Sequence, residues 1–218
     1  MFEYCSFVSV PYTHMNASTA LTRLQQGNAR FVAGTSNLSG AANATQRSRL
    51  SAGQSPFAIV LGCADSRVPP ELVFDQGLGE LFVVRVAGNI AATSQICSIE
   101  FAVEQFAVPL VIVLGHSQCG AVGATIDCLT TGNTTLPGNI YWAVNHIRPA
   151  IEPLLHEKQA DAGGQLMAQA VRANIQAAVT QLRNSPLLGE RIDHGALSIL
   201  GAEYALPSGK VKFFDHSG

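Results

Sequence analysis

Short apolar runs separated by longer amphipathic stretches set the pattern of this chain. Three of the runs are too short for a helix, are rich in β-branched residues and show no alternation of apolar and polar positions. Runs of this kind are typical of parallel strands that are buried on both faces of a sheet. The pattern therefore predicts strands at 57–61, 81–86 and 110–114, and a fourth strand at 196–206.

Between these runs, apolar residues recur at helical spacing. In the first such stretch Leu21, Leu24 and Phe31 share one helical face, and Ser18 or Thr19 can cap its start. The spacing predicts helices at 19–32, 46–52, 93–106, 139–157 and 165–184.

Prolines interrupt the last two of these helices. Pro149 and Pro153 must break or kink the fourth predicted helix, because proline lacks the backbone N–H that a helix interior needs. The Ser185-Pro186 pair ends the fifth predicted helix.

A Pro-Ser-Gly turn at 207–209 predicts a hairpin between the last apolar run and an antiparallel edge strand at 210–214. The alternation of strand and helix before it favours a parallel sheet with right-handed crossovers. We expect a single α/β domain, with a central, mainly parallel sheet of four parallel strands and an antiparallel edge strand, flanked by helices. Residues 1–52 form an N-terminal helical arm, and residues 53–218 form the α/β core.

Composition adds expectations about the surface and the partners. Charged residues make up 13% of the 218 residues and hydrophobic ones 47%, whereas soluble domains are ~25% charged, so part of the surface is expected in an oligomer interface. The net charge is −2 with no basic run, which argues against nucleic acid or anionic membrane as a partner.

No apolar run approaches the ~20 residues of a membrane span. Residues 1–16 lack the basic start of a signal peptide, so a cytoplasmic location is expected, with an organellar location or an exported form whose signal has been cleaved as the alternatives.

Metal-ligating residues follow two of the predicted strands. Gly115 lets the backbone turn after one strand, and His116 and Cys119 come next, while Cys63 follows another strand. Parallel strands commonly present ligand sites at their carboxyl ends. Two thiolates and one imidazole suit Zn²⁺ and leave a fourth position for water, as in catalytic zinc sites. The sequence therefore predicts one zinc ion per chain.

The spacing C-x-D-x-R at 63–67 and G-H-S-x-C-G at 115–120 resembles the β-class carbonic anhydrases. Three further phrases, at 24–34, 80–89 and 195–213, extend the resemblance over most of the chain. It implies reversible hydration of carbon dioxide to bicarbonate and a proton by zinc-activated hydroxide. It also implies homodimers, often paired into tetramers, with the site at the subunit boundary.

Asp65 and Arg67 are the candidate catalytic pair. Arg67 can hold Asp65 ionised through a bidentate contact, and Asp65 can then orient the attacking hydroxide. Spacing alone leaves this role and a plain ion pair within the loop evenly balanced, and the resemblance favours catalysis. In bicarbonate-regulated members of the family the aspartate can close onto zinc. Those members resemble one another in a tryptophan where this chain has Val60, so the open, plant-type form is expected here.

The resemblance also implies a substrate pocket. Gln54 corresponds to a residue that hydrogen-bonds substrate, although spacing alone favours an ordinary loop glutamine. Phe82 corresponds to an aromatic wall, Phe101 stands where many members have tyrosine, and Ala87 stands where plant-type members have a bulkier valine. The backbone N–H of Gly120 can donate to a bound bicarbonate oxygen.

Two other functions remain open at this level. The first is a related enzyme that uses the same zinc loop to hydrolyse CS2 or COS. The second is a scaffold protein that binds zinc without catalysing a reaction. Such a scaffold would need neither Asp65 nor Arg67. Cys97 and Cys128 are expected to be small buried residues on helices, as free cysteines often are. No local signal marks a proton shuttle among the remaining histidines His14, His146, His156, His194 and His216.

Overall fold

The structure, a computed structural model, describes residues 15–38, 43–132, 135–156 and 165–214. Along the chain its elements are α1 (Ala17–Ala33), α2 (Ala44–Leu50), β1 (Ala58–Cys63), α3 (Pro70–Val73), β2 (Leu81–Val86), the 3₁₀ turn η1 (Ala87–Asn89), α4 (Thr93–Phe106), β3 (Leu110–His116), α5 (Gly120–Thr131), α6 (Ile140–His156), α7 (Gln165–Arg183), α8 (Pro186–Asp193), β4 (Ser198–Tyr204) and β5 (Val211–Phe213).

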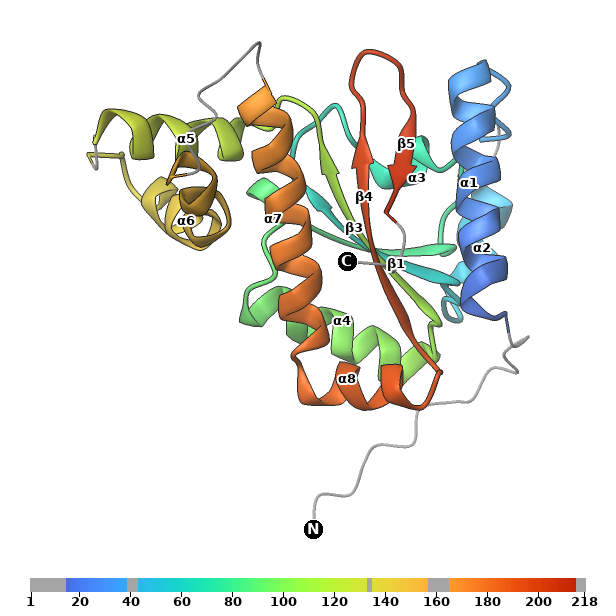
Figure 1. Ribbon diagram of the computed structural model, residues 1–218. Coiled ribbons are helices and arrows are strands. Elements are labelled where there is room, and N and C mark those ends of the chain that lie inside the picture. Colours follow the sequence, from blue (N-terminus) through green and yellow to red (C-terminus); the bar gives the residue numbers. More distant parts are fainter. Residues whose placement is uncertain (1–14, 39–42, 133–134, 157–164, 215–218) are drawn as a thin grey trace.

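Five strands form one sheet in the order β2-β1-β3-β4-β5 (Figure 1). The pairs β1–β2, β1–β3 and β3–β4 are parallel, and β5 runs antiparallel to β4. The α/β fold with a mainly parallel sheet and an antiparallel edge is therefore confirmed. Since β1 and β3 are neighbours, the residues that follow them meet at one edge of the sheet.

Both faces of the sheet are buried, which explains the unbroken apolar runs. In β3, Val111 and Val113 face one core and Leu110, Ile112 and Leu114 face the other, and all five are fully buried. Helices α4, α6, α7 and α8 contribute to the first core and α1 to the second. A strand covered on both sides needs apolar residues at every position.

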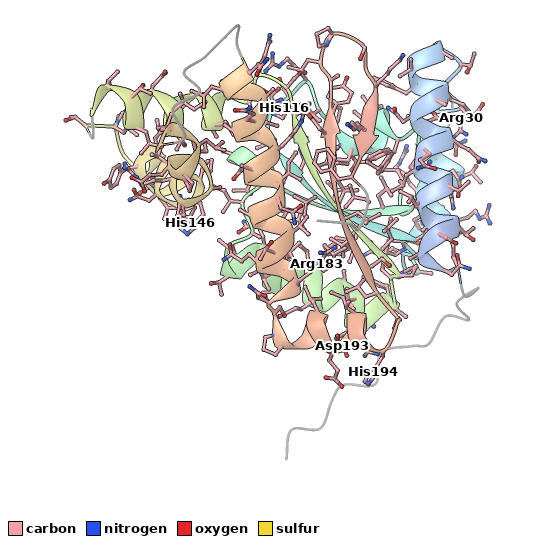
Figure 2. All side chains as sticks on the ribbon, in the orientation of Figure 1. Arg30, His116, His146, Arg183, Asp193 and His194 are labelled. Carbon is pink, nitrogen blue, oxygen red and sulfur yellow. The ribbon has the colours of Figure 1, made fainter. Side chains whose placement is uncertain are left out.

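The two edges of the sheet are far apart. His116 ends β3 beside Tyr204, whereas Leu110 begins β3 beside Ser198. The seven residues of β4 span about 20 Å between these edges. His194 follows α8 shortly before β4 begins, so it lies at the amino edge, opposite His116 (Figure 2).

At two helix ends the structure changes or extends the prediction. Asn16, rather than Ser18 or Thr19, caps α1, because its side chain accepts a hydrogen bond of 2.8 Å from the Thr19 N–H. The Ser185-Pro186 pair ends α7 but also begins α8, where the Ser185 side chain accepts from the Leu188 N–H. Serine as N-cap followed by proline at the first helical position is a start signal as well as a stop signal.

Helix α6 continues through Pro149 and Pro153, so of the predicted break or kink at these residues, the break does not occur. Each proline removes one backbone hydrogen bond. The helix buries Val144, Ile147 and Ile151 almost completely, and this apolar stripe offsets the loss.

Two smaller expectations are also corrected. Gly115 does not turn the backbone, because β3 continues to His116 and the turn comes at Gln118, with φ +55°. Instead, a Cβ at Gly115 would lie 2.5 Å from an Ile175 side-chain carbon, so glycine permits close helix–sheet packing there. Cys128 is buried as expected, whereas Cys97 is exposed on α4.

Among the described helices, none is long and apolar enough to cross a membrane. The cytoplasmic location stays a prediction, and residues 1–14, on which part of it rests, lie outside the described residues. The division into an arm (1–52) and a core (53–218) also stays a prediction.

Candidate metal centre

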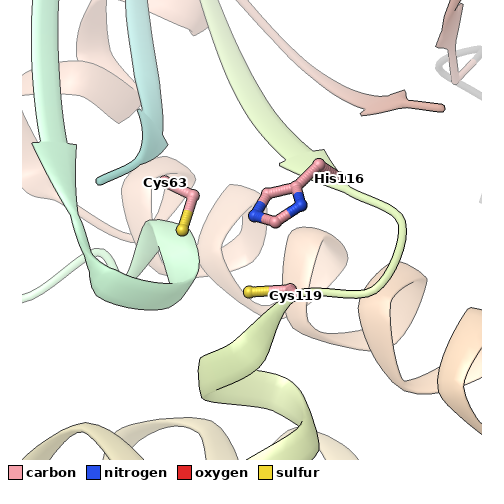
Figure 3. A group of neighbouring side chains, drawn as sticks. All are labelled: Cys63, His116 and Cys119. Atoms are coloured by element: carbon pink, nitrogen blue, oxygen red, sulfur yellow. The ribbon is translucent and has the colours of Figure 1, made fainter. Parts of the chain in front are cut away.

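Three side chains meet where β1 and β3 end (Figure 3). Cys63 is the last residue of β1, His116 is the last of β3, and Cys119 is the N-cap of α5. Their ligand atoms all lie within 4.8 Å of one another, and all three residues are buried. The structure therefore brings together the three predicted zinc ligands.

The imidazole of His116 is oriented as a metal ligand. Its Nδ1 lies 2.9 Å from the Ser117 carbonyl oxygen, which only accepts hydrogen bonds, so Nδ1 carries the proton. Its Nε2 then holds a free lone pair, and this buried atom has no hydrogen-bond partner among the residues that the structure describes. A hydrogen bond from one ring nitrogen to a carbonyl commonly fixes a metal-ligating histidine. The orphaned nitrogen and the two sulfur donors together fit Zn²⁺.

The two thiols influence each other strongly. A hydrogen bond from Cys119, aided by the backbone N–H of Gly88 and opposed by burial, lowers the pKa of Cys63 well below its usual range. The adjacent Cys63 sulfur and burial raise the pKa of Cys119. Without a cation, one sulfur is therefore readily ionised and its neighbour resists a second negative charge. A divalent cation between the sulfurs removes that resistance, because coordination deprotonates a thiol.

Asp65 and Arg67 form a bidentate ion pair next to the centre. Arg67 donates from Nε to Oδ1 at 2.9 Å and from Nη2 to Oδ2 at 2.7 Å, and its backbone N–H also reaches Oδ1. These hydrogen bonds from Arg67 hold the pKa of Asp65 well below its usual range. The Oδ2 atom lies 3.9 Å from Nε2 of His116. An ionised acceptor thus faces the metal position.

The structure adds residues that the sequence reasoning missed. Arg85 donates to the Cys63 carbonyl at 2.9 Å and to the Asp65 carbonyl at 2.5 Å, which fixes the loop between the ligand and the ion pair. Asn174 of α7 donates to the Gly88 carbonyl at 2.8 Å. Arg85 interrupts the apolar run of β2, and Asn174 lies on the apolar face of α7. A polar residue at such a position is the sequence signal that could have identified each of them.

An apolar cavity of about 520 Å³ opens beside the centre. Ala87 and Gly120, two of the predicted pocket residues, line it together with Trp142 and Ala143 of α6. A Cβ at Gly120 would meet nothing within 4 Å, so the space next to Cys119 is open.

The other predicted pocket residues lie elsewhere in the single chain. Phe82 and Phe101 both pack against Phe106, with ring centroids 6.1 Å apart in each pair. Gln54 lines a separate hollow that also contains Arg49 and Leu78.

Known proteins match this arrangement over nearly the whole chain. The family model described as carbonic anhydrase matches residues 58–211. The solved structure of the β-carbonic anhydrase CcaA superposes with a TM-score of 0.73 at 30% identity, covering 89% of this chain and 95% of that one. This chain belongs to the β-class carbonic anhydrases. Carbonic anhydrase 2 of Mycobacterium tuberculosis is 38% identical over 203 residues, covering 93% of this chain and 95% of the relative.

A second relative gives the same result. The carbonic anhydrase of Mycolicibacterium smegmatis is 39% identical over 204 residues, covering 93% of this chain and 96% of the relative. As a β-class carbonic anhydrase, this chain carries its zinc site at Cys63, His116 and Cys119 and interconverts carbon dioxide and bicarbonate.

Proposed function

We propose that Asp65 and Arg67 orient the attacking water in this carbonic anhydrase. Zinc at the Cys63–His116–Cys119 site supplies a Lewis acid that makes water nucleophilic at neutral pH. Asp65, kept ionised by Arg67, accepts a hydrogen bond from that nucleophile and directs its lone pair at carbon dioxide. The observation that carries the proposal is the separation of 3.9 Å between the Asp65 carboxylate and the unpartnered Nε2 of His116.

The zinc site is of the open, plant-type form. Three protein ligands leave a fourth position for water. Arg67 engages both oxygens of the Asp65 carboxylate, which favours Asp65 as a hydrogen-bond acceptor over Asp65 as a ligand. Val60 of β1, fully buried, stands where the bicarbonate-regulated members have tryptophan. Activity is therefore expected to fall smoothly with decreasing pH. A steep loss that is cooperative in bicarbonate would contradict the open form.

Carbon dioxide binds in the cavity beside Ala87 and Gly120. The apolar lining suits an uncharged substrate, and the exposed N–H of Gly120, at the start of α5, can donate to a bicarbonate oxygen. Phe82, Phe101 and Gln54 complete the pocket when a second subunit is present.

The active form is a homodimer, which can pair further into a tetramer. Support comes from large apolar side chains that are exposed in the single chain, among them Leu72, Leu78 and Phe101, which are 47–51% exposed. Gln54 shares its hollow with Leu78, so covering that surface places Gln54 against the other subunit. Light scattering that finds only monomer in the active preparation would contradict this assembly.

The deciding experiment is stopped-flow hydration of carbon dioxide on metal-quantified protein, with Cys63→Ser as the control. Turnover that follows one zinc per chain, and is absent from the control, supports the proposed function. Full zinc occupancy without turnover would contradict it, and CS2 and COS hydrolysis would then be measured to separate a hydrolase from a scaffold.

A further inference from the structure

Hydration of carbon dioxide releases a proton, and the described residues that line the apolar cavity beside the metal centre include no ionisable side chain. The cavity beside the metal centre extends from Ala87 and Gly120 to Ile140 and Trp142, and Asn139 is the polar exception among its lining residues. Its volume of about 520 Å³ is large enough for several water molecules, each of which takes about 30 Å³. Water can therefore carry a proton across the cavity, but none of the described side chains in its walls can accept one.

An imidazole stacks on Trp142, one of the residues that line this cavity. His146, exposed on α6, stacks on Trp142 with ring centroids 3.9 Å apart and an interplanar angle of 35°. Its Nδ1 lies 2.8 Å from the Trp142 carbonyl oxygen. Because a carbonyl only accepts, Nδ1 carries the proton of the neutral ring. The lone pair is then on Nε2, which is free to take a proton.

Other imidazoles are less well placed within the part of the chain that the structure describes. His116 is the buried zinc ligand, and His194 lies at the amino edge of the sheet, about 20 Å from the carboxyl edge along β4. Figure 2 shows His194 below the sheet and His146 on α6. His14, His216 and the side chain of His156 lie outside the described residues.

We propose that His146 relays the proton of carbon dioxide hydration from this cavity to buffer in solution. Water and carbon dioxide yield bicarbonate and one proton, which crosses the cavity through water and binds Nε2 of His146. The resulting imidazolium returns the same proton to a buffer base, so the ring is unchanged after each cycle. Trp142 acts as the positioning residue, because its ring and carbonyl fix the imidazole at the cavity wall. The relay rests on the carbonic anhydrase activity of the chain.

The test compares His146→Ala with His194→Ala, a matched loss of an imidazole at the opposite edge. In dilute buffer, His146→Ala is expected to lower kcat by about tenfold or more while kcat/KM stays unchanged, because the proton leaves after bicarbonate is formed. Concentrated imidazole buffer should restore kcat. His194→Ala should behave as the wild-type chain in both buffers.

A third variant separates proton transfer from packing. His146→Phe keeps an aromatic ring on Trp142 without a titratable nitrogen, so it should show the same buffer-dependent loss and the same rescue. The relay is overturned if kcat of both His146 variants is unchanged in dilute buffer. It is equally overturned if kcat and kcat/KM fall together and imidazole does not restore them. Absence of hydration by the wild-type chain in any buffer would instead overturn the activity itself, and the relay with it.

Discussion

Two buried polar clusters in this protein differ in how completely their atoms are partnered. Between α1 and the segment after α3, Asn28 donates to the Val73 and Gly209 carbonyls and accepts from the Val211 N–H. Nearby, the carboxylate of Asp75 accepts hydrogen bonds at both oxygens. At the metal centre, by contrast, Nε2 of His116 is buried and has no hydrogen-bond partner among the residues that the structure describes.

This difference in partnering distinguishes a cluster that stabilises the fold from one that binds a ligand. Buried polar atoms are nearly always hydrogen-bonded, because an unpaired one costs about 1–3 kcal/mol. The Asn28–Asp75 cluster is complete within the protein and holds α1 to the body of the domain. The metal centre, in contrast, has donor atoms that lack a partner within the protein. A bound cation would satisfy them. The same burial therefore indicates a fold element in one place and a binding site in the other.

Removing a zinc ligand gives the largest effect on activity. Cys63→Ser or His116→Ala is expected to lose zinc and to lower turnover by more than about a hundredfold, since even residues behind the ligands matter at the level of 10–100-fold. Metal analysis and stopped-flow hydration measure both quantities. A variant with full zinc and normal turnover would show that this triad is not the site.

Asp65→Asn separates metal binding from turnover. The variant loses the acceptor that orients water, so turnover is expected to fall by about 10²-fold or more with zinc retained. Glu104→Gln, which breaks another ion pair, with Arg191 at 2.7 Å, is the matched control and should keep its activity. Near-normal rates in Asp65→Asn would remove the residue from the mechanism.

Breaking the complete cluster should change stability and leave the chemistry intact. Asn28→Ala leaves two carbonyls and one N–H without their partner, so the free energy of unfolding is expected to drop by about 2–4 kcal/mol. Turnover per bound zinc should match the wild-type chain. Denaturant unfolding beside a hydration assay tests this, and a selective loss of turnover would place Asn28 in the function after all.

The smallest effect concerns acid. Burial opposes ionisation of Asp75, but hydrogen bonds from Ser36, Arg30 and the Asn37 N–H prevail and leave its pKa lowered. The unfolded chain then binds this proton more readily. The stabilisation is therefore present above the unfolded pKa of about 3.9 and is lost as pH falls through the lower folded pKa.

Asp75→Asn tests this contribution. The substitution should cost about 1–2 kcal/mol of stability at neutral pH and flatten the decline in acid. Measuring both chains in the Cys63→Ser background removes any contribution from zinc release. Parallel acid curves for the two chains would show that Asp75 does not titrate as described.

Local patterns and long-range contacts were not equally predictable. The apolar runs located β1, β2 and β3 to within two residues, because burial on both faces leaves few residue choices. The prolines of α6 misled the prediction, since a buried stripe on the same helix outweighs their cost. The Ser185-Pro186 pair predicts the end of α7, and the structure shows that the cap provided by Ser185 also begins α8.

The sequence by itself determined the fold class, through the alternation of apolar runs and helical stretches along the chain. It also determined the three zinc ligands and the neighbouring Asp65–Arg67 pair, because all of them lie within a few residues of the end of an apolar run. Only the tertiary structure decided the proton position on His116, the hold of Arg85 on the ligand loop and the stacking of His146 at the cavity wall. It also placed Gln54 in a different hollow from Ala87. These features depend on contacts between atoms of separate elements or on burial. Neither can be read from the order of residues along the chain.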